Sequence, residues 1–101
     1  MSRQDAGHAV RWRLMTAGDL AAVKTIADRI HVNHPEDMPV FAERLALYPA
    51  GCHVAEADAR LVGYALSHPW RYGEPPALDT PLGAVPADAT TFYLHDVALL
   101  A

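Results

Sequence analysis

The chain has 101 residues, of which 51% are hydrophobic and 20% are charged, and its formal net charge is −4. This length allows one domain, and the composition is that of a folded domain rather than a disordered segment. The acidic balance excludes the basic face that a nucleic-acid-binding protein presents.

The sequence has the features of a cytoplasmic protein. Cys52 is the only cysteine, so no internal disulfide can form and a reducing compartment is expected. No apolar run approaches the roughly 20 residues that a membrane helix needs, so we expect no membrane partner. Residues 1–9 are polar and lack the apolar core of a signal peptide. We expect them to form a flexible lead to a domain over residues 10–101.

The first half of the domain is predicted to hold one strand and two helices. Apolar residues alternate with arginines over residues 10–15, which predicts a half-buried strand. Thr16 followed by Asp19 is typical of a helix start, and the amphipathic helix that follows ends near residues 33–35. A second, shorter helix is predicted over residues 38–47.

A β-hairpin is predicted next. Residues 52–57 and 60–68 are strand-like and are separated by the short polar turn at residues 58–59. Gly63 lies inside the second arm, which indicates a bulge or a close approach of another backbone.

The last part of the chain combines a long loop with a strand. Residues 69–89 contain five of the eight prolines, and a loop of this length inside a compact domain is often functional. Residues 91–100 are aromatic, apolar and β-branched, without Gly or Pro, and give the strongest strand signal in the chain.

Three stretches occur in order along this pattern: "RLMTAGDLAAV", "CHVAEADARLVGYAL" and "FYLHDVALL". They resemble the opening strand-to-helix segment, the second and third strands, and the fourth strand of the GNAT N-acetyltransferase superfamily. The resemblance covers about residues 10–100. It implies an α/β (α+β) fold, with a mixed, mainly antiparallel sheet of about four strands and two N-terminal helices. It also implies direct transfer of an acetyl group from acetyl-CoA to an amine of a small molecule or a protein, without a metal.

The sequence departs from the family after the fourth strand. In the family a glycine-rich loop follows and holds the cofactor pyrophosphate, whereas only Leu100 and Ala101 follow Leu99 here. We therefore interpret the chain as a partial domain that lacks the C-terminal half of the fold, with weakened acetyl-CoA binding and impaired activity. The alternative is a non-catalytic half-domain that binds a partner, or forms a homodimer through its exposed C-terminal strand.

The resemblance assigns the cofactor contacts to Val97, Ala98 and Leu99. In the family the pantetheine amides bind to the backbone at the open edge of the fourth strand, as an added strand would. The side chains of Val97 and Leu99 are expected to belong to the core.

The resemblance also directs attention to a general base on the fourth strand. The carboxylate that usually serves in the family is replaced here by Tyr93. Strict alternation puts Tyr93, His95, Val97 and Leu99 on one face, and His95 has a side chain suited to proton transfer near neutral pH. A half-buried histidine that is bonded to a backbone carbonyl is the alternative. Asp96 is expected on the opposite face and is therefore a weaker candidate for the base than His95.

Two segments supply candidate acceptor contacts. In the family the connection between the first two helices lines the acceptor side, which makes His34, Glu36 and Asp37 candidates to contact a cationic amine. Trp70 and Tyr72 begin the long loop, where exposed aromatic residues either contact ligands or hold the loop on the domain surface. The identity of the amine is left open.

Two further patterns are compatible with a chemical role but favour a structural one. His31 and His34 have a metal-like spacing, but no carboxylate or cysteine pattern completes a ligand set. Cys52 is a conceivable nucleophile, but a lone cysteine at the head of a strand is more often inert packing. Direct acetyl transfer without an acyl-enzyme is therefore expected.

Overall fold

The computed structural model describes residues 9–33, 35–76 and 79–100. Helices and strands follow one another in the predicted order. They are β1 (Arg11–Leu14), α1 (Leu20–Ile30), α2 (Met38–Leu47), β2 (Cys52–Ala57), β3 (Arg60–Trp70) and β4 (Thr91–Leu99), with short 3-10 helices at Ala17–Asp19 and Pro49–Gly51.

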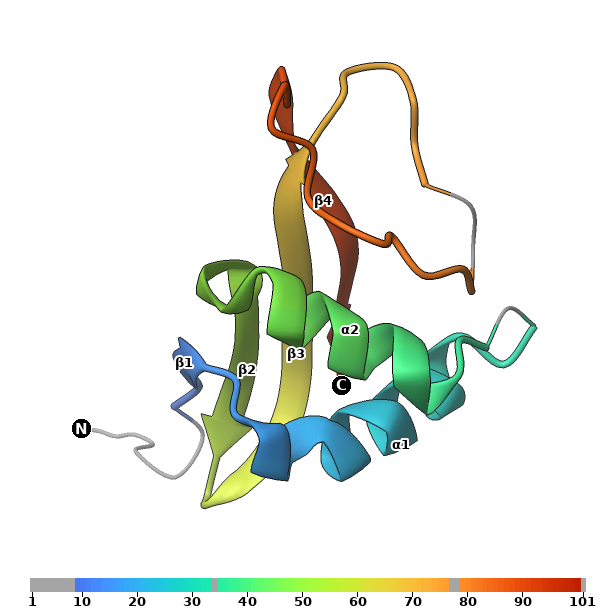
Figure 1. Cartoon of the computed structure of the whole chain (residues 1–101). Coiled ribbons are helices and arrows are strands. Elements are labelled where there is room, and N and C mark those ends of the chain that lie inside the picture. The colour runs from blue at the N-terminus through green and yellow to red at the C-terminus, as the bar shows by residue number, and fades with distance from the viewer. Residues whose placement is uncertain (1–8, 34, 77–78, 101) are drawn as a thin grey trace.

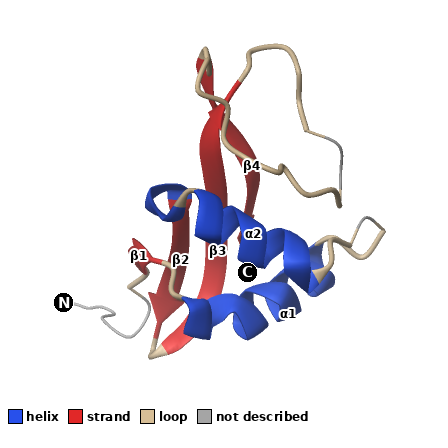
Figure 2. Ribbon diagram, viewed as in Figure 1, coloured by secondary structure: helices blue, strands red, loops and turns tan. Residues whose placement is uncertain are grey.

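The four strands form one antiparallel sheet in the order β1-β2-β3-β4. Both helices lie on the same face of this sheet (Figures 1 and 2). β4 is an edge strand of the described sheet, and the end of β3, residues 67–70, pairs with β4 alone. The predicted fold class, with two helices and a four-stranded, mainly antiparallel sheet, is confirmed.

The start of α1 is fixed to β1 by a carboxylate. The backbone N–H of Thr16 donates to Asp19 at 2.8 Å, as the predicted helix start requires. The two Nη atoms of Arg13, on β1, donate to the two carboxylate oxygens of Asp19 at 2.8 and 2.9 Å. The hydrogen bonds from Arg13 lower the pKa of Asp19 to about 2, so this pair joins the first strand to the first helix.

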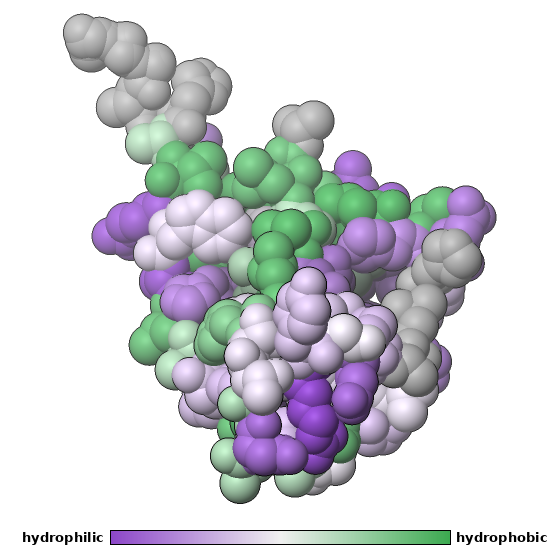
Figure 3. Space-filling model, turned by 90° about the horizontal axis from the view of Figure 1, so that it is seen from above, coloured by the Kyte–Doolittle hydropathy of each residue, from purple (hydrophilic) through white to green (hydrophobic). Residues whose placement is uncertain are grey.

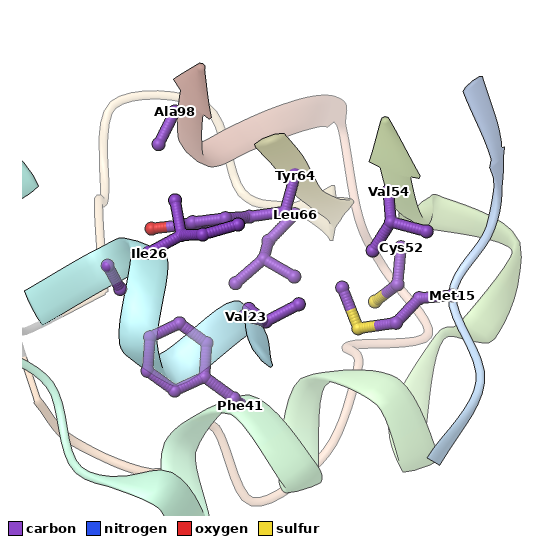
Figure 4. Packing of buried hydrophobic residues seen from close by; sticks show 10 residues of the cluster. Met15, Val23, Ile26, Phe41, Cys52, Val54, Tyr64, Leu66 and Ala98 are labelled. Carbon is purple, nitrogen blue, oxygen red and sulfur yellow. The ribbon is translucent and has the colours of Figure 1, made fainter. Parts of the chain in front are cut away.

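The hydrophobic core lies between the helices and the sheet (Figure 4). Its buried residues are Met15, Val23, Ile26, Ala27, Phe41, Cys52, Val54, Tyr64, Leu66 and Ala98. Phe41 on α2 meets Tyr64 on β3 edge to face, with ring centroids 6.1 Å apart and an interplanar angle of 89°. This contact holds α2 to the middle of β3.

The hairpin has the predicted turn and the predicted close approach. Asp58 and Ala59 form the turn with positive φ values of 53° and 63°. The pairing of β2 with β3 shifts register beside Gly63. A Cβ added to Gly63 would lie 2.6 Å from the carbonyl oxygen of Ala98, so only glycine lets β4 approach this closely.

The long loop begins later than the sequence predicted. β3 continues through Pro69 to Trp70, and the loop therefore spans residues 71–90. A proline can occupy this strand because β3 pairs there only with β4, which leaves its other edge free. The prediction failed because it took Pro69 as a strand end.

The fourth strand contains a β-bulge that the sequence did not predict. Leu66 on β3 pairs with Asp96, and the next residue, Ser67, pairs with Leu94. His95 is therefore the extra residue of β4. A bulge of this kind changes the alternation of side chains along the strand that contains it.

The bulge overturns the predicted faces of β4. Asp96 and His95 both point toward the helix-covered face, where each side chain has a hydrogen-bond partner from the segment after α1. Tyr93 lies on this face too, opposite His68. Val97 and Leu99 have instead moved to the open face and are 52% and 55% exposed, so the expectation that their side chains are core residues is wrong.

The open face of the sheet is rich in exposed apolar side chains. Figure 3, seen from above, shows several hydrophobic patches (green) beside hydrophilic ones (purple). The exposed large hydrophobic residues of the four strands are Trp12, Leu14, Phe92, Leu94, Val97 and Leu99. Among the described residues, no helix is long and apolar enough to cross a membrane.

Candidate active site

The β4 bulge brings two of the predicted site residues into contact. The Nε2 atom of His95 lies 2.9 Å from Oε1 of Glu36, in the connection between α1 and α2, and both side chains are 6% exposed. A carboxylate oxygen can only accept, so Nε2 of His95 carries the hydrogen. The other ring nitrogen, Nδ1, has no hydrogen-bond partner among the described residues and can offer a lone pair.

Glu36 also binds the long loop. Its second oxygen accepts the backbone N–H of Asp79 at 2.9 Å, and the backbone N–H of Asp37 donates to the Asp79 carboxylate at 2.7 Å. Burial alone would raise the pKa of Glu36, but the hydrogen bonds from His95 and Asp79 outweigh it and lower the pKa. Glu36 is therefore an ionised carboxylate near neutral pH, with both oxygens engaged.

A second histidine, on β3, lies next to this pair. The ring centroid of His68 lies 5.7 Å from that of Tyr93 and 6.5 Å from that of His95. Nδ1 of His68 lies 3.0 Å from the carbonyl oxygen of Pro69 and donates to it, which leaves Nε2 as an acceptor. His68 is 2% exposed, and burial lowers its pKa, so its ring is neutral near neutral pH.

Arg44, on α2, is buried beside the histidines with little hydrogen bonding. It is 2% exposed, and Nη2 reaches the carbonyl oxygen of Thr80 only at 3.5 Å. Burial lowers the pKa of Arg44, although the charges of Glu36 and Glu43 oppose this effect. Nε and Nη1 of Arg44 are buried without a hydrogen-bond partner in the part of the chain that the structure describes.

These residues form one group, buried except for the half-buried Tyr93, which we call the polar cluster: Glu36, Arg44, His68, Tyr93 and His95. Within residues 9–33, 35–76 and 79–100, the buried side-chain nitrogen and oxygen atoms without a partner are three atoms of this cluster, two on Arg44 and one on His68. Buried ionisable groups are costly, and unsatisfied ones more so. Such a concentration of perturbed groups is typical of a functional site.

A short segment of the long loop covers the polar cluster. The carboxylate of Glu43, on α2, accepts the backbone N–H groups of Leu82 and Gly83 at 2.6 and 2.9 Å. Together with the contact from Asp79 to Glu36, these bonds hold residues 79–83, which we call the strap, against α2. The carboxylates of Glu36 and Glu43 thus both bind the strap, and Glu36 also orients His95.

The backbone of β4 offers a free edge near the polar cluster. The N–H of Leu100 donates to the carbonyl oxygen of Val62, on β3, at 2.7 Å. Successive residues of a strand direct their amides to opposite edges, so those of Val97 and Leu99 face away from β3 and that of Ala98 faces toward it. The predicted cofactor positions Val97 and Leu99 therefore have edge amides available to a ligand.

Asp96 belongs to a separate network. Its two carboxylate oxygens lie 2.5 Å from the Tyr64 hydroxyl and 2.9 Å from Nε2 of His31. Burial and the hydrogen bond to Asp96 raise the pKa of Tyr64, so the tyrosine hydroxyl stays protonated and donates to Asp96. With both oxygens engaged, Asp96 is less available as a base than Nδ1 of His95.

The remaining predicted contacts lie at the edge of the site or outside the described residues. The Trp70 ring packs edge to face on His68 with centroids 5.3 Å apart, and its indole N–H donates to the carbonyl oxygen of Glu74 at 2.6 Å. Tyr72 is 81% exposed and stands apart from the polar cluster's hydrogen bonds. His34 lies outside the described residues, so its predicted acceptor contact remains a prediction.

Cys52 has the environment of a packing residue. It is buried in the core, and burial raises its pKa to about 11. The thiol is therefore protonated near neutral pH, which is unfavourable for a nucleophile. Among the described residues, no group of three or more His, Cys, Asp or Glu side chains is placed to hold a metal ion.

Sequence reasoning missed Arg44 and His68, although a signal for both was present. Arg44 follows Phe41 by three residues, on the buried face of α2. His68 follows Leu66 by two residues, on the buried face of β3. A charged or polar residue at a position that periodicity assigns to the core predicts a buried polar site.

Comparisons with known proteins identify the fold. Ard1 from Thermoplasma volcanium is similar with a TM-score of 0.54 and 15% identity, over 64% of this chain and 42% of that chain. A GNAT family acetyltransferase from Brucella melitensis, solved in complex with acetyl-CoA, is similar with a TM-score of 0.52 and 21% identity, over 92% of this chain and 56% of that chain. No protein-family model and no curated protein matches the sequence. The chain has a GNAT-like fold, as predicted, and spans about half the length of these two structures.

Proposed function

We propose that the chain takes part in acetyl-CoA-dependent acetylation of an amine, with direct transfer of the acetyl group in the cytoplasm. The observation that supports this proposal most strongly is the buried contact of His95 with Glu36, because His95 lies on β4, whose outer amides have no strand partner among the described residues. In a GNAT-like fold, these features supply a base and a docking edge for the acyl donor.

The free edge of β4 fits the amide groups of acetyl-CoA. An extended, amide-containing chain can add to a strand edge through backbone hydrogen bonds, for which the amides of Val97 and Leu99 are available. The thioester would then lie near the bulge at His95.

The polar cluster supplies the proton chemistry of the reaction. Nδ1 of His95 accepts a proton from the acceptor ammonium, while Glu36 holds Nε2–H and stabilises the imidazolium that forms. The amine nitrogen then attacks the thioester carbonyl carbon, forming a C–N bond. The C–S bond breaks, coenzyme A leaves as a thiolate and takes up the second proton that the attacking nitrogen loses, and His95 returns its proton to solvent.

An acetylation assay tests the proposal. The chain is incubated with millimolar acetyl-CoA and a panel of amines, and released thiol and acetylated product are quantified by colorimetry and mass spectrometry. We expect turnover that His95→Gln removes and that the exposed control Glu74→Gln retains. Turnover that is equal in the wild type and His95→Gln would refute the role of His95.

A second candidate function is self-association through β4. Four large apolar side chains of this edge strand are exposed: Phe92, Leu94, Val97 and Leu99. A second copy could pair with this edge, since a free apolar edge strand favours pairing between chains. A monodisperse monomer in light scattering at concentrations up to about 1 mM would exclude this alternative, because weaker association does not stabilise a dimer.

A further inference from the structure

We propose that Arg44 and His68 form a subsite for an acceptor that carries a carboxylate beside its amine, the simplest such acceptor being an α-amino acid. The assignment of this subsite to the acceptor of the reaction rests on the proposed acetyl transfer. The subsite itself rests on the three unpartnered atoms of the polar cluster, and its test does not require acetyl-CoA.

The missing partners define the chemistry of the ligand. Nε and Nη1 of Arg44 are donors and require oxygen acceptors, and a guanidinium pairs most strongly with a carboxylate. Nε2 of His68 is an acceptor because Nδ1 donates to Pro69, so it requires a donor such as an amine N–H. A ligand that satisfies both residues carries an acceptor and a donor group.

The charges around the subsite favour a zwitterion over a simple anion. Arg44 contributes one positive charge, and its neighbours Glu36 and Glu43 contribute two negative charges. An isolated carboxylate would be attracted by the guanidinium and repelled by both glutamates. A ligand that brings its own ammonium group adds no net charge, and its cationic end is attracted by the negative surroundings.

The strap controls access to Arg44. The Thr80 carbonyl lies over Nη2 at 3.5 Å, which is the limit of a hydrogen bond, so this contact is weak. The stronger bonds of the strap are those from its backbone to Glu43 and Glu36. An acceptor that reaches Nη2 of Arg44 must displace the Thr80 carbonyl from it.

Direct binding measurements test the proposal. The standard L-amino acids are titrated into the chain without acetyl-CoA, with calorimetry and the imidazole NMR signals of His68 as readouts. Two analogues accompany L-leucine: 3-methylbutylamine lacks the carboxylate, and 4-methylpentanoate lacks the amine. We expect at least one amino acid to bind and to shift the His68 signals, with each matched analogue binding about 10- to 100-fold more weakly.

The variant Arg44→Met separates a ligand site from a structural role. We expect it to weaken amino-acid binding by a similar factor and to raise the melting temperature of the unliganded chain, because it removes an unpaired buried charge. The control Arg29→Met, on the exposed end of α1, should change neither property.

Three results of these binding and stability measurements would overturn the subsite. These are no binding of any standard L-amino acid at millimolar concentration, binding unchanged in Arg44→Met, or a lower melting temperature in that variant. Equal acetylation of L-leucine and 3-methylbutylamine would remove the subsite and leave acetyl transfer intact. Amino-acid binding without acetylation of any amine would support the subsite and refute the proposed acetyl transfer.

Discussion

Nε2 of His95 lies 2.9 Å from Oε1 of Glu36, across the gap between a strand bulge and the connection of two helices. The bulge turns His95 toward the helices, and the carboxylate fixes which ring nitrogen carries the hydrogen. Glu36 thereby orients His95 and, through Asp79, holds the strap over the polar cluster.

The substitution Glu36→Gln tests how far acetylation depends on this orientation. General acid–base catalysis contributes about 10²–10⁴-fold, and we expect Glu36→Gln to lose about tenfold or more of kcat, because the amide no longer stabilises the imidazolium. The KM for acetyl-CoA should remain unchanged, because Glu36 does not lie on the β4 edge. Steady-state kinetics would contradict this account if KM for acetyl-CoA rose while kcat stayed constant.

Glu36 should also make the free energy of unfolding depend on pH in the acidic range. Its pKa lies below the usual 4.5 in the folded state, so the stability that it contributes is present above pH 4.5 and is lost as the pH falls through the folded value. Urea unfolding from about pH 7 to about pH 3 measures this. We expect Glu36→Gln to be less stable near pH 7 by about 1.5–3 kcal/mol, and the difference to shrink below pH 4.5. A constant difference would contradict this linkage.

Gly51→Ala should destabilise the fold. A Cβ on Gly51 would lie 2.0 Å from the backbone carbonyl oxygen of Ser67, so β3 must move away from the 3-10 helix Pro49–Gly51. We expect a loss of about 1–3 kcal/mol in the free energy of unfolding, measured by urea titration. Gly18→Ala is the matched control, because its Cβ would lie 3.7 Å from the Thr16 hydroxyl, which is an ordinary van der Waals distance. Equal stability of the two variants would show that β3 adapts freely.

The Cys52 thiol should be unreactive in the folded chain. Its pKa of about 11 keeps the thiol protonated, and its burial blocks access. We expect no labelling by iodoacetamide near pH 7 before unfolding, and acetyl transfer should persist in Cys52→Ala. Rapid labelling of the folded chain, followed by mass spectrometry, would reopen the acyl-enzyme alternative.

Local signals in the sequence predicted most of the fold. The second helix, residues 38–47, and the turn at Asp58 and Ala59 depend on neighbouring residues, and both match the structure. The bulge at His95 depends instead on the pairing of β4 with β3, which strict alternation along one strand cannot reveal.

For the same reason, only part of the candidate site was predicted from the sequence. His95 and Glu36 were identified separately, but their contact required the bulge and the path of the α1–α2 connection. Arg44 and His68 interrupt apolar patterns at core positions, and their unpaired atoms become visible only when the strap is in place. Buried polar groups that contradict the local pattern are expected at functional sites.

The measurement that tests the central claim most directly is an NMR titration of the ¹⁵N-labelled chain with acetyl-CoA. It detects weak binding and reports each backbone amide. The account predicts saturable shifts of the Val97 and Leu99 amides on the free edge of β4, together with the His95 ring signals, and a smaller shift of Ala98, whose amide faces β3. Saturable shifts confined to other surfaces, or none at millimolar acetyl-CoA, would contradict it.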